Sequence, residues 1–409
     1  MAGDGQAVRV RIGMMTLLTL FASFASAHGG PEVYTIAPDA DPQRAAMVGG
    51  LLTAGEDGWD WVCEDVWGGS ALVDSVQLGD RFIFSTTFGL FWTDDGCSFT
   101  QSADFGDVWV SGLELRNDVL WAVTTDGLFT STDGDRWSEV DGPWQGDLRG
   151  LAVTVDGAQM FVVGVQGEGD AASGVVTIGH PRTGWQSVPF ETPSPDVRVH
   201  GIDSSGRAYI STPLGQDTLL RVDGTGQVET LLTAPLLVNG VSDVGGVLSV
   251  SVFTRGVQTS TDDGVTWSAL SGPTIAGITT HDGVRYAGAE FGQDLALALR
   301  DTGTGFEEWL FQEDVIGPRD CPADSDAAVT CAGQWEEFVD FLNSTTTNEP
   351  RNEPEPGPQE ETGCSTLPGP GLGLLALLPL LGLRRRREPV DEAHGVGHRR
   401  ACLTEPDPI

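Results

Sequence analysis

Short apolar runs, each opened by a glycine, follow one another along most of the chain. Examples are Gly50-Leu51-Leu52, Gly89-Leu90-Phe91 and Gly127-Leu128-Phe129, and a later copy begins at Gly256-Val257. Clusters of Ser, Thr, Asp and Gly separate these runs. Short apolar runs between turn residues are typical of strands rather than helices. The pattern therefore predicts an all-β chain built from repeats.

The runs recur about every forty residues. The first three glycines are 39 and 38 residues apart, and the next 129 residues leave room for two hidden repeats, at 174–185 and 218–226. A last copy lies at 295–306. Seven units of this length match the period of a four-stranded propeller blade. We therefore predict a seven-bladed β-propeller.

A second series of glycines has a similar period. Its members are Gly112, Gly150, Gly201, Gly240 and Gly277, with spacings of 38, 51, 39 and 37 residues. We interpret them as innermost strands, where glycine permits close approach of the backbones. The long second spacing predicts an insertion in the fourth blade, at 166–173.

The most complete turn signal is Ser260-Thr261-Asp262-Asp263-Gly264-Val265-Thr266-Trp267. Its Ser and Asp can bond nearby backbone, its Gly accepts a positive φ, and its Trp can anchor the turn. It resembles the Asp-box of sialidases, sortilin-type receptors and related β-propellers. The positions that carry the resemblance are Glu56, Gly58, Trp61, Asp94, Gly96, Phe99, Ser131, Asp133, Trp137, Ser260, Asp262, Gly264 and Trp267. The resemblance implies structural turns between the two outer strands of a blade.

The ends of the chain differ from the repeats. Arg9 and Arg11 precede an apolar run, and Ala25-Ser26-Ala27 matches an A-x-A cleavage site, so residues 1–27 are predicted to be a secretory signal peptide. The propeller with its C-terminal extension is expected at 28–345. Residues 346–362 are rich in Pro, Glu and Asn and predict a disordered linker.

An apolar segment with an arginine cluster follows at 363–387, before a polar tail at 388–409. Gly363-Cys364, the run 367–383 and four arginines resemble the MYXO-CTERM sorting tail of myxobacterial surface proteins. The resemblance implies processing at Cys364 and anchoring at the cell surface or outer envelope. The alternative is a plain transmembrane helix held by its arginines. Both alternatives predict an exported protein.

Six cysteines are then expected in an oxidising compartment. Cys63 and Cys97 lie near the turns of adjacent blades, which predicts a Cys63–Cys97 disulfide. Cys321 and Cys331 are predicted to close a small loop after the last blade. Residues 335–342 carry apolar residues at helical spacing, which predicts a short helix packed on the propeller.

Charge limits the kinds of partner. The chain has 59 acidic residues and 22 basic ones, all arginine, for a net charge of −37. Such an acidic protein is a poor match for nucleic acid or for an anionic membrane surface. No metal-ligand spacing or phosphate-binding loop occurs in the sequence, so we expect no cofactor and no metal.

One candidate ligand face follows from the tryptophans. Trp67, Trp109 and Trp144 each come shortly before an expected innermost strand, with Arg149 close by. An aromatic arc at the mouth of the channel suits a sugar or a peptide. The alternative is that these rings wedge between blades as core.

The function expected from this architecture is a surface-displayed, monomeric binding or scaffolding propeller for a protein or glycan. A secreted glycan-active hydrolase is the first alternative, and an assembly factor for an extracytoplasmic or membrane complex is the second. Sialidase chemistry needs three arginines and a Tyr nucleophile together, and nothing in the sequence groups Arg81, Arg149 and Arg198. We therefore assign no catalytic residue and favour a protein that is not an enzyme.

Overall fold

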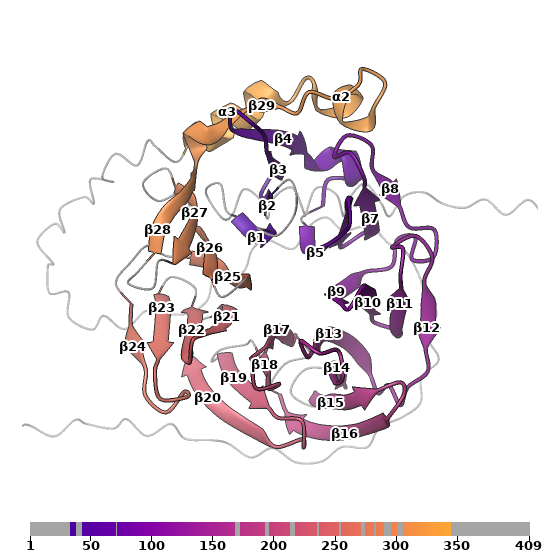
Figure 1. The fold of residues 1–409 in the computed structure, drawn as a ribbon, viewed down its shortest axis with the longest axis vertical. Coiled ribbons are helices and arrows are strands. Elements are labelled where there is room, and N and C mark those ends of the chain that lie inside the picture. The colour runs from indigo at the N-terminus through magenta and orange to yellow at the C-terminus, as the bar shows by residue number, and fades with distance from the viewer. Residues whose placement is uncertain are drawn as a thin grey trace, which may run out of the picture. The chain divides into compact units, whose positions relative to one another are not determined.

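Seven sheets stand around a central axis in the computed structural model (Figure 1). Six of them have four antiparallel strands in simple meander order, and the seventh has a fifth strand. The protein is therefore a seven-bladed β-propeller, as the repeat spacing predicts. Each inner strand contacts the inner strands of the blades on either side, which closes the ring.

The structure describes residues 33–37, 43–70, 72–167, 172–192, 196–212, 217–234, 237–252, 255–270, 275–281, 284–289, 296–301 and 306–344. The expected signal peptide, linker, apolar segment with Cys364 and polar tail lie outside these ranges. So do the central residues of the expected insertion, which falls between β14 and β15. Within the described ranges we find no helix with the length and apolar character needed to cross a membrane.

The strands of the first three blades, from the axis outward, are β1 (Val33–Ala37), β2 (Arg44–Met47), β3 (Gly50–Ala54) and β4 (Trp59–Cys63); β5 (Leu72–Leu78), β6 (Arg81–Thr86), β7 (Gly89–Thr93) and β8 (Thr100–Gln101); β9 (Val110–Arg116), β10 (Val119–Thr124), β11 (Leu128–Ser131) and β12 (Ser138–Val140).

The strands of the other four blades, in the same order, are β13 (Asp147–Val153), β14 (Met160–Gln166), β15 (Ser173–His180) and β16 (Gly184–Glu191); β17 (Arg198–Ile202), β18 (Ala208–Thr212), β19 (Asp217–Val222) and β20 (Val228–Ala234); β21 (Val238–Val244), β22 (Val247–Val252), β23 (Gly256–Ser260) and β24 (Ser268–Ala269); β25 (Ile275–His281), β26 (Val284–Ala289), β27 (Ala296–Asp301) and β28 (Phe306–Phe311).

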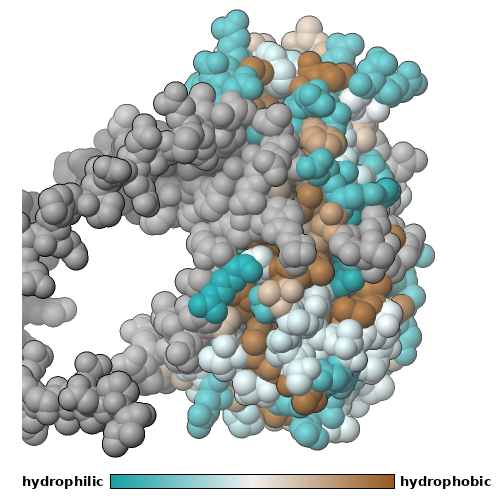
Figure 2. Space-filling model, turned by 90° about the vertical axis from the view of Figure 1, so that its left-hand side faces the viewer, coloured by the Kyte–Doolittle hydropathy of each residue, from teal (hydrophilic) through white to brown (hydrophobic). Residues whose placement is uncertain are grey.

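The core lies between the blades. The second strands of the blades are almost wholly buried because they have neighbours on both faces, as in β14, where Met160 to Val165 are all buried. The outer strands β16 and β20 are mostly half-buried or exposed instead, with one buried residue in each. On the side of the propeller that Figure 2 shows, brown apolar residues lie in small groups among teal and white ones.

The chain returns to the first blade at its end. β29 (Val315–Pro318) pairs in parallel with β4 and adds a fifth strand to the outer edge of that blade. Two helices follow, α2 (Asp326–Cys331) and α3 (Trp335–Ser344). The expected short helix is therefore present, and Phe338 of α3 stacks on Trp61 of β4 with ring centres 4.4 Å apart.

Two disulfides hold this C-terminal extension, but not with the pairing expected from the sequence. Cys63 bonds Cys331, and Cys97 bonds Cys321. The predicted pairs Cys63–Cys97 and Cys321–Cys331 are wrong because β29 carries the end of the chain across blades 1 and 2. Each bond therefore joins the extension to a blade. Disulfides of this kind indicate folding in an oxidising, extracytoplasmic compartment.

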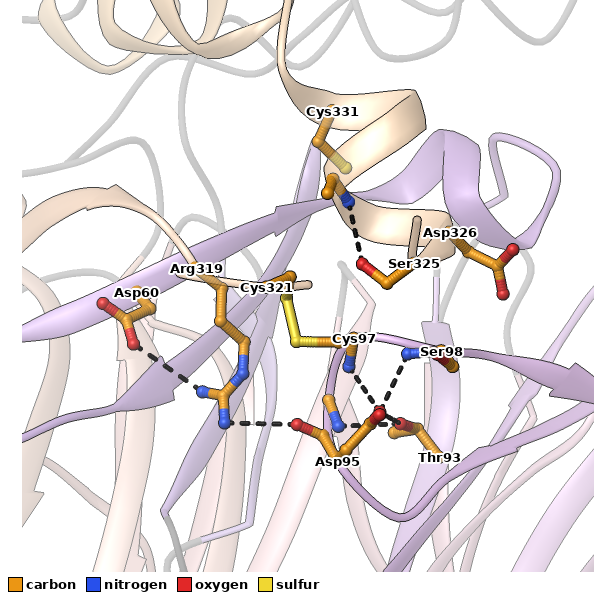
Figure 3. Close-up of a disulfide and its surroundings, with 12 residues drawn as sticks. Asp60, Thr93, Asp95, Cys97, Ser98, Arg319, Cys321, Ser325, Asp326 and Cys331 are labelled. Carbon is orange, nitrogen blue, oxygen red and sulfur yellow. Dashed lines mark hydrogen bonds and ion pairs between the residues drawn. A yellow bond between two sulfur atoms is a disulfide. The ribbon is translucent and has the colours of Figure 1, made fainter. Parts of the chain in front are cut away.

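Figure 3 shows how the extension contacts the second blade. The Cys97–Cys321 bond lies beside the turn that joins β7 to β8. The Arg319 guanidinium lies between the Asp60 carboxylate, at 3.7 Å, and the Asp95 carbonyl, at 3.3 Å. Beyond it, the Ala327 N–H donates to the Cys97 carbonyl.

Candidate ligand face

The two faces of the propeller are built from different connections. In a meander, the links from one blade to the next and the turns between second and third strands share one face, here called the axial face. The turns between first and second and between third and fourth strands share the opposite face, here called the turn face. The inner strands begin at the axial face.

All seven inner strands have a β-bulge at the same place near that face. One residue of each is skipped in the pairing with the second strand, as expected for a bulge. The skipped residues are Tyr34, Val73, Ser111, Arg149, His200, Asn239 and Ala276. They form one ring of equivalent positions around the mouth of the channel.

The glycines of the second sequence series follow these bulges directly. A Cβ at Gly150 would lie 2.6 Å from Val199, and one at Gly240 would lie 2.6 Å from the backbone nitrogen of Ile278. Close approach of neighbouring inner strands therefore explains both. Gly201 has open space around it and is explained by its φ of +119° instead.

Blade 2 has Asp74 in this position, which is why the glycine series begins only at blade 3. Its carboxylate crosses to the next blade and accepts the Leu113 N–H at 2.8 Å. Burial raises the pKa of Asp74 to about 6, although the N–H groups of Leu113 and Ser75 oppose the shift. Asp74 thus connects the inner strands of blades 2 and 3 through a hydrogen bond.

The three predicted tryptophans have different environments. Trp67 is 2% exposed, its Nε1–H donates to the Ser70 carbonyl, and its ring meets Phe84 edge-on, so it is core. Trp144 donates to the Val140 carbonyl and packs against Trp185. Trp109 is half-buried, with the Arg149 guanidinium carbon 5.7 Å from its ring centre. Trp67 is therefore lost from the expected arc, while Trp144 is half-buried like Trp109 but has its Nε1–H satisfied within the protein.

Three exposed apolar residues that sequence reasoning missed, here called the apolar patch, lie on the same face as Trp109, and Val108 precedes Trp109 in the chain. Val73, Phe88 and Val108 are each 39% exposed and come from the axial face of blades 2 and 3. The Gln101 amide ties the segments together by donating to the carbonyls of Phe88 and Gly106. Only the exposure of these residues marks the patch, because apolar residues of this kind occur in every blade of the sequence.

His200 and Arg198 bring polar groups to the same mouth. The His200 Nε2 lies 2.9 Å from the Ser211 hydroxyl. Burial, with a further effect of Arg198, lowers the pKa of His200 to about 3, so the ring is neutral at physiological pH. Asp217 accepts the Val238 N–H, and burial raises its pKa.

The turn face carries the predicted Ser–Asp–Gly turns. In blade 6, the Ser260 hydroxyl donates to Asp262 and accepts the Gly264 N–H, while Asp262 accepts the Thr266 N–H. Ser131, Asp133 and Gly134 repeat this pattern in blade 3. Asp262 and Asp133 therefore stabilise their turns by accepting backbone hydrogen bonds.

Two of the expected turn copies need correction. In blade 2 the accepting carboxylate is Asp95, not Asp94, and it takes the N–H groups of Cys97 and Ser98. In blade 1 Trp61 lies under α3 rather than over a turn, and exposed Glu56 makes none of the described turn bonds. In blade 2 the motif fitted either of two adjacent aspartates. In blade 1 the tryptophan that fitted the motif belongs to strand β4.

Arginines link neighbouring blades on the same face. Arg207 of blade 5 bonds both carboxylate oxygens of Asp263 in blade 6, at 2.9 Å each, and also bonds Asp203. The hydrogen bonds from Arg207, and further contacts with Arg221, lower the pKa of Asp263 to about 2. Arg81 bonds Asp94 and reaches the Asp133 carbonyl of blade 3.

The arginines weighed for sialidase chemistry are thus divided between the faces. Arg81 is on the turn face, while Arg149 and Arg198 are on neighbouring inner strands at the axial face. Tyr209 is buried and its hydroxyl donates to Asp203, and Tyr286 packs edge-on against Trp309. In the part of the chain that the structure describes, no group of three His, Cys, Asp or Glu side chains is placed to hold a metal.

Comparison with known proteins agrees on the fold. No family model and no curated protein matches the chain. Among solved structures, a catalytically inactive virginiamycin B lyase from Staphylococcus aureus, with quinupristin, is 12% identical over 64% of this chain and 93% of its own, with a TM-score of 0.50. At this identity the likeness supports the propeller class and nothing finer.

Two further matches have lower TM-scores. The extracellular domain of BT4673 from B. thetaiotaomicron is 16% identical over 64% of this chain, with a TM-score of 0.49. This chain covers only 37% of that protein. YCF48 bound to D1 peptide is 16% identical over 66% of this chain and 92% of its own, with a TM-score of 0.47.

Proposed function

We propose that this protein is a non-catalytic binding propeller that receives a protein ligand on the axial face of blades 2 to 4. The observation that carries the proposal is the exposed group Val73, Phe88 and Val108 beside half-buried Trp109. Apolar surface next to an aromatic side chain, with polar residues around it, is typical of interaction sites. Exposed Asp107 and Asp126 supply such a polar rim.

The scaffold suits this role. The closed ring of paired strands holds the segments that carry Val73, Phe88 and Val108 in place, so less conformational entropy opposes binding than for an unstructured chain. We further infer that the repeats are of the Asp-box type, supported by the side-chain bonds of the turns in blades 2, 3 and 6. In this account the protein is exported and held at the cell surface through its C-terminal tail, with Cys364 as the processing site.

Peptide and glycan arrays, together with a glycoside hydrolase screen of the purified exported protein, test the proposal. We expect peptide binding that Val108→Asp abolishes and that Val155→Asp leaves unchanged. Val155 is a matched control because it is a 74% exposed valine on the turn face. Release of sugar products would instead favour the hydrolase, and glycan binding insensitive to Val108→Asp would contradict the proposed face.

A further inference from the structure

Two buried hydrogen-bond donors at the candidate ligand face have no acceptor. The Nε1 atom of Trp109 and the Nε atom of Arg149 are both buried, and neither has a hydrogen-bond partner among the described residues. A buried polar group without a partner costs roughly 1–3 kcal/mol. The Arg149 guanidinium carbon lies 5.7 Å from the Trp109 ring centre, so two such donors close together indicate a place where an acceptor group from outside would be stabilised.

Charges of both signs lie close together at this place. Arg149 and Arg198 lie on adjacent inner strands, which approach each other closely at Gly150 and Val199. Arg149 is bonded to Asp147 through Nη2 alone, at 3.2 Å, and that carboxylate is 65% exposed. Because a guanidinium has five N–H donors in a planar fork, Arg149 retains donors for a second carboxylate.

The net charge of −37 does not prevent such binding. At physiological ionic strength the screening length is about 8 Å, so the nearest arginines and aspartates decide the local potential. Arg149 and Arg198 lie among the carboxylates Asp147, Asp196 and Asp217 around the mouth, so direct hydrogen bonds rather than net charge would select the ligand. The hydrogen bonds of Trp109 and Arg149 then favour an anionic acceptor over a neutral one.

We propose that Trp109 and Arg149 bind a carboxylate whose carrier places an apolar side chain on Val73, Phe88 and Val108. The C-terminal residue of a peptide has this chemistry, with the carboxylate and the side chain on one carbon atom. The inference rests on the proposed function and deepens it, because it names the group of the ligand that the face recognises. Trp109 and Arg149 are the binding residues, and Arg198 adds to the local charge.

Titration of the ¹⁵N-labelled exported protein with N-acetyl-leucine, followed through the Trp109 indole N–H resonance, tests this. The resonance is assigned by its loss in Trp109→Phe. We expect a saturable shift with N-acetyl-leucine and about tenfold weaker binding of N-acetyl-leucinamide, which lacks the charge. Arg149→Met should weaken the acid about tenfold, and Arg136→Met, at an exposed arginine of the turn face, should change it less than about twofold.

Each other result counts against the proposal. An unchanged Trp109 resonance, or equal shifts with acid and amide, would overturn the carboxylate site. D-glucuronate, a carboxylate without an apolar side chain, serves as a third probe. If it shifts the resonance as much as N-acetyl-leucine or more, the proposed contact of the ligand with the apolar patch is wrong. If these titrations fail while Val108→Asp still abolishes peptide binding, the proposed function stands and only the recognised group is wrong.

Discussion

Neighbouring aspartates in one turn differ in the hydrogen bonds that they accept. Asp95 accepts two backbone N–H groups and the Thr93 hydroxyl, whereas its neighbour Asp94 is 52% exposed and pairs only with Arg81. Burial opposes ionisation of Asp95, but these hydrogen bonds keep its pKa below the ordinary value. The sequence did not separate the two residues because both fit a degenerate copy of the motif.

This difference can be measured with two alanine variants. We expect Asp95→Ala to lower the free energy of unfolding by about 1–3 kcal/mol, because hydrogen bonds from the turn to a charged carboxylate are lost. Asp94→Ala removes an exposed ion pair and should cost about 0–1 kcal/mol. Chemical denaturation of both variants decides between them, and a larger loss for Asp94→Ala would restore the register expected from the sequence.

A second residue-scale prediction concerns pH. Burial, with a smaller effect of Asp74, raises the pKa of Glu114 to about 7, against the opposing effects of Arg116 and the Val153 N–H. A glutamate in an unfolded chain has a pKa of about 4.3. Between these values the folded protein binds more protons than the unfolded one, so this group lowers stability as pH rises from about 4 to about 7.

Glu114→Gln should remove that loss because the amide resembles the protonated acid and does not titrate. We expect the variant to match the wild type at pH 4.5 and to exceed it by about 1–3 kcal/mol at pH 8. Thermal unfolding at both pH values measures this, with exposed Glu139→Gln as the control. Parallel behaviour of the wild type and Glu114→Gln across the range would show that Glu114 is already ionised at low pH.

At the scale of elements, spacing predicted most of the propeller. The seven blades and their inner strands follow from apolar runs and glycines that recur in the repeats. The terminal helix follows from apolar residues at helical spacing. The disulfide pairing does not follow, because it depends on β29 crossing back to β4, a contact between residues more than 250 positions apart. The burial of Trp67 also does not follow from the sequence, because the sequence does not distinguish a tryptophan packed between blades from one at the surface.

The C-terminal extension gives an element-scale prediction. Replacing Cys63 and Cys331 by serine opens a link that spans 268 residues, and we expect a loss of about 2–5 kcal/mol. The extension should then become sensitive to protease while the blades stay protected. Non-reducing peptide mapping of the wild type provides the check on pairing: peptides joining Cys63 to Cys97 would refute the observed arrangement.

At the scale of the whole molecule, the two faces have separate roles. The turn face contains Arg81, Arg207 and Arg221, which bond aspartates or backbone of a neighbouring blade and so join the blades. The axial face contains the exposed apolar patch and two donor atoms, Trp109 Nε1 and Arg149 Nε, which have no partner among the described residues. This division assigns stability to one face and ligand binding to the other.

Site-specific photo-cross-linking in intact cells tests that division most directly. A photoreactive amino acid is placed at position 108 of the full chain, and at position 155 in a matched strain. The account predicts that position 108 yields a discrete covalent adduct, that position 155 yields none, and that Arg149→Met weakens the adduct at 108. Adducts at 155 with none at 108 would contradict it and move the binding site to the turn face.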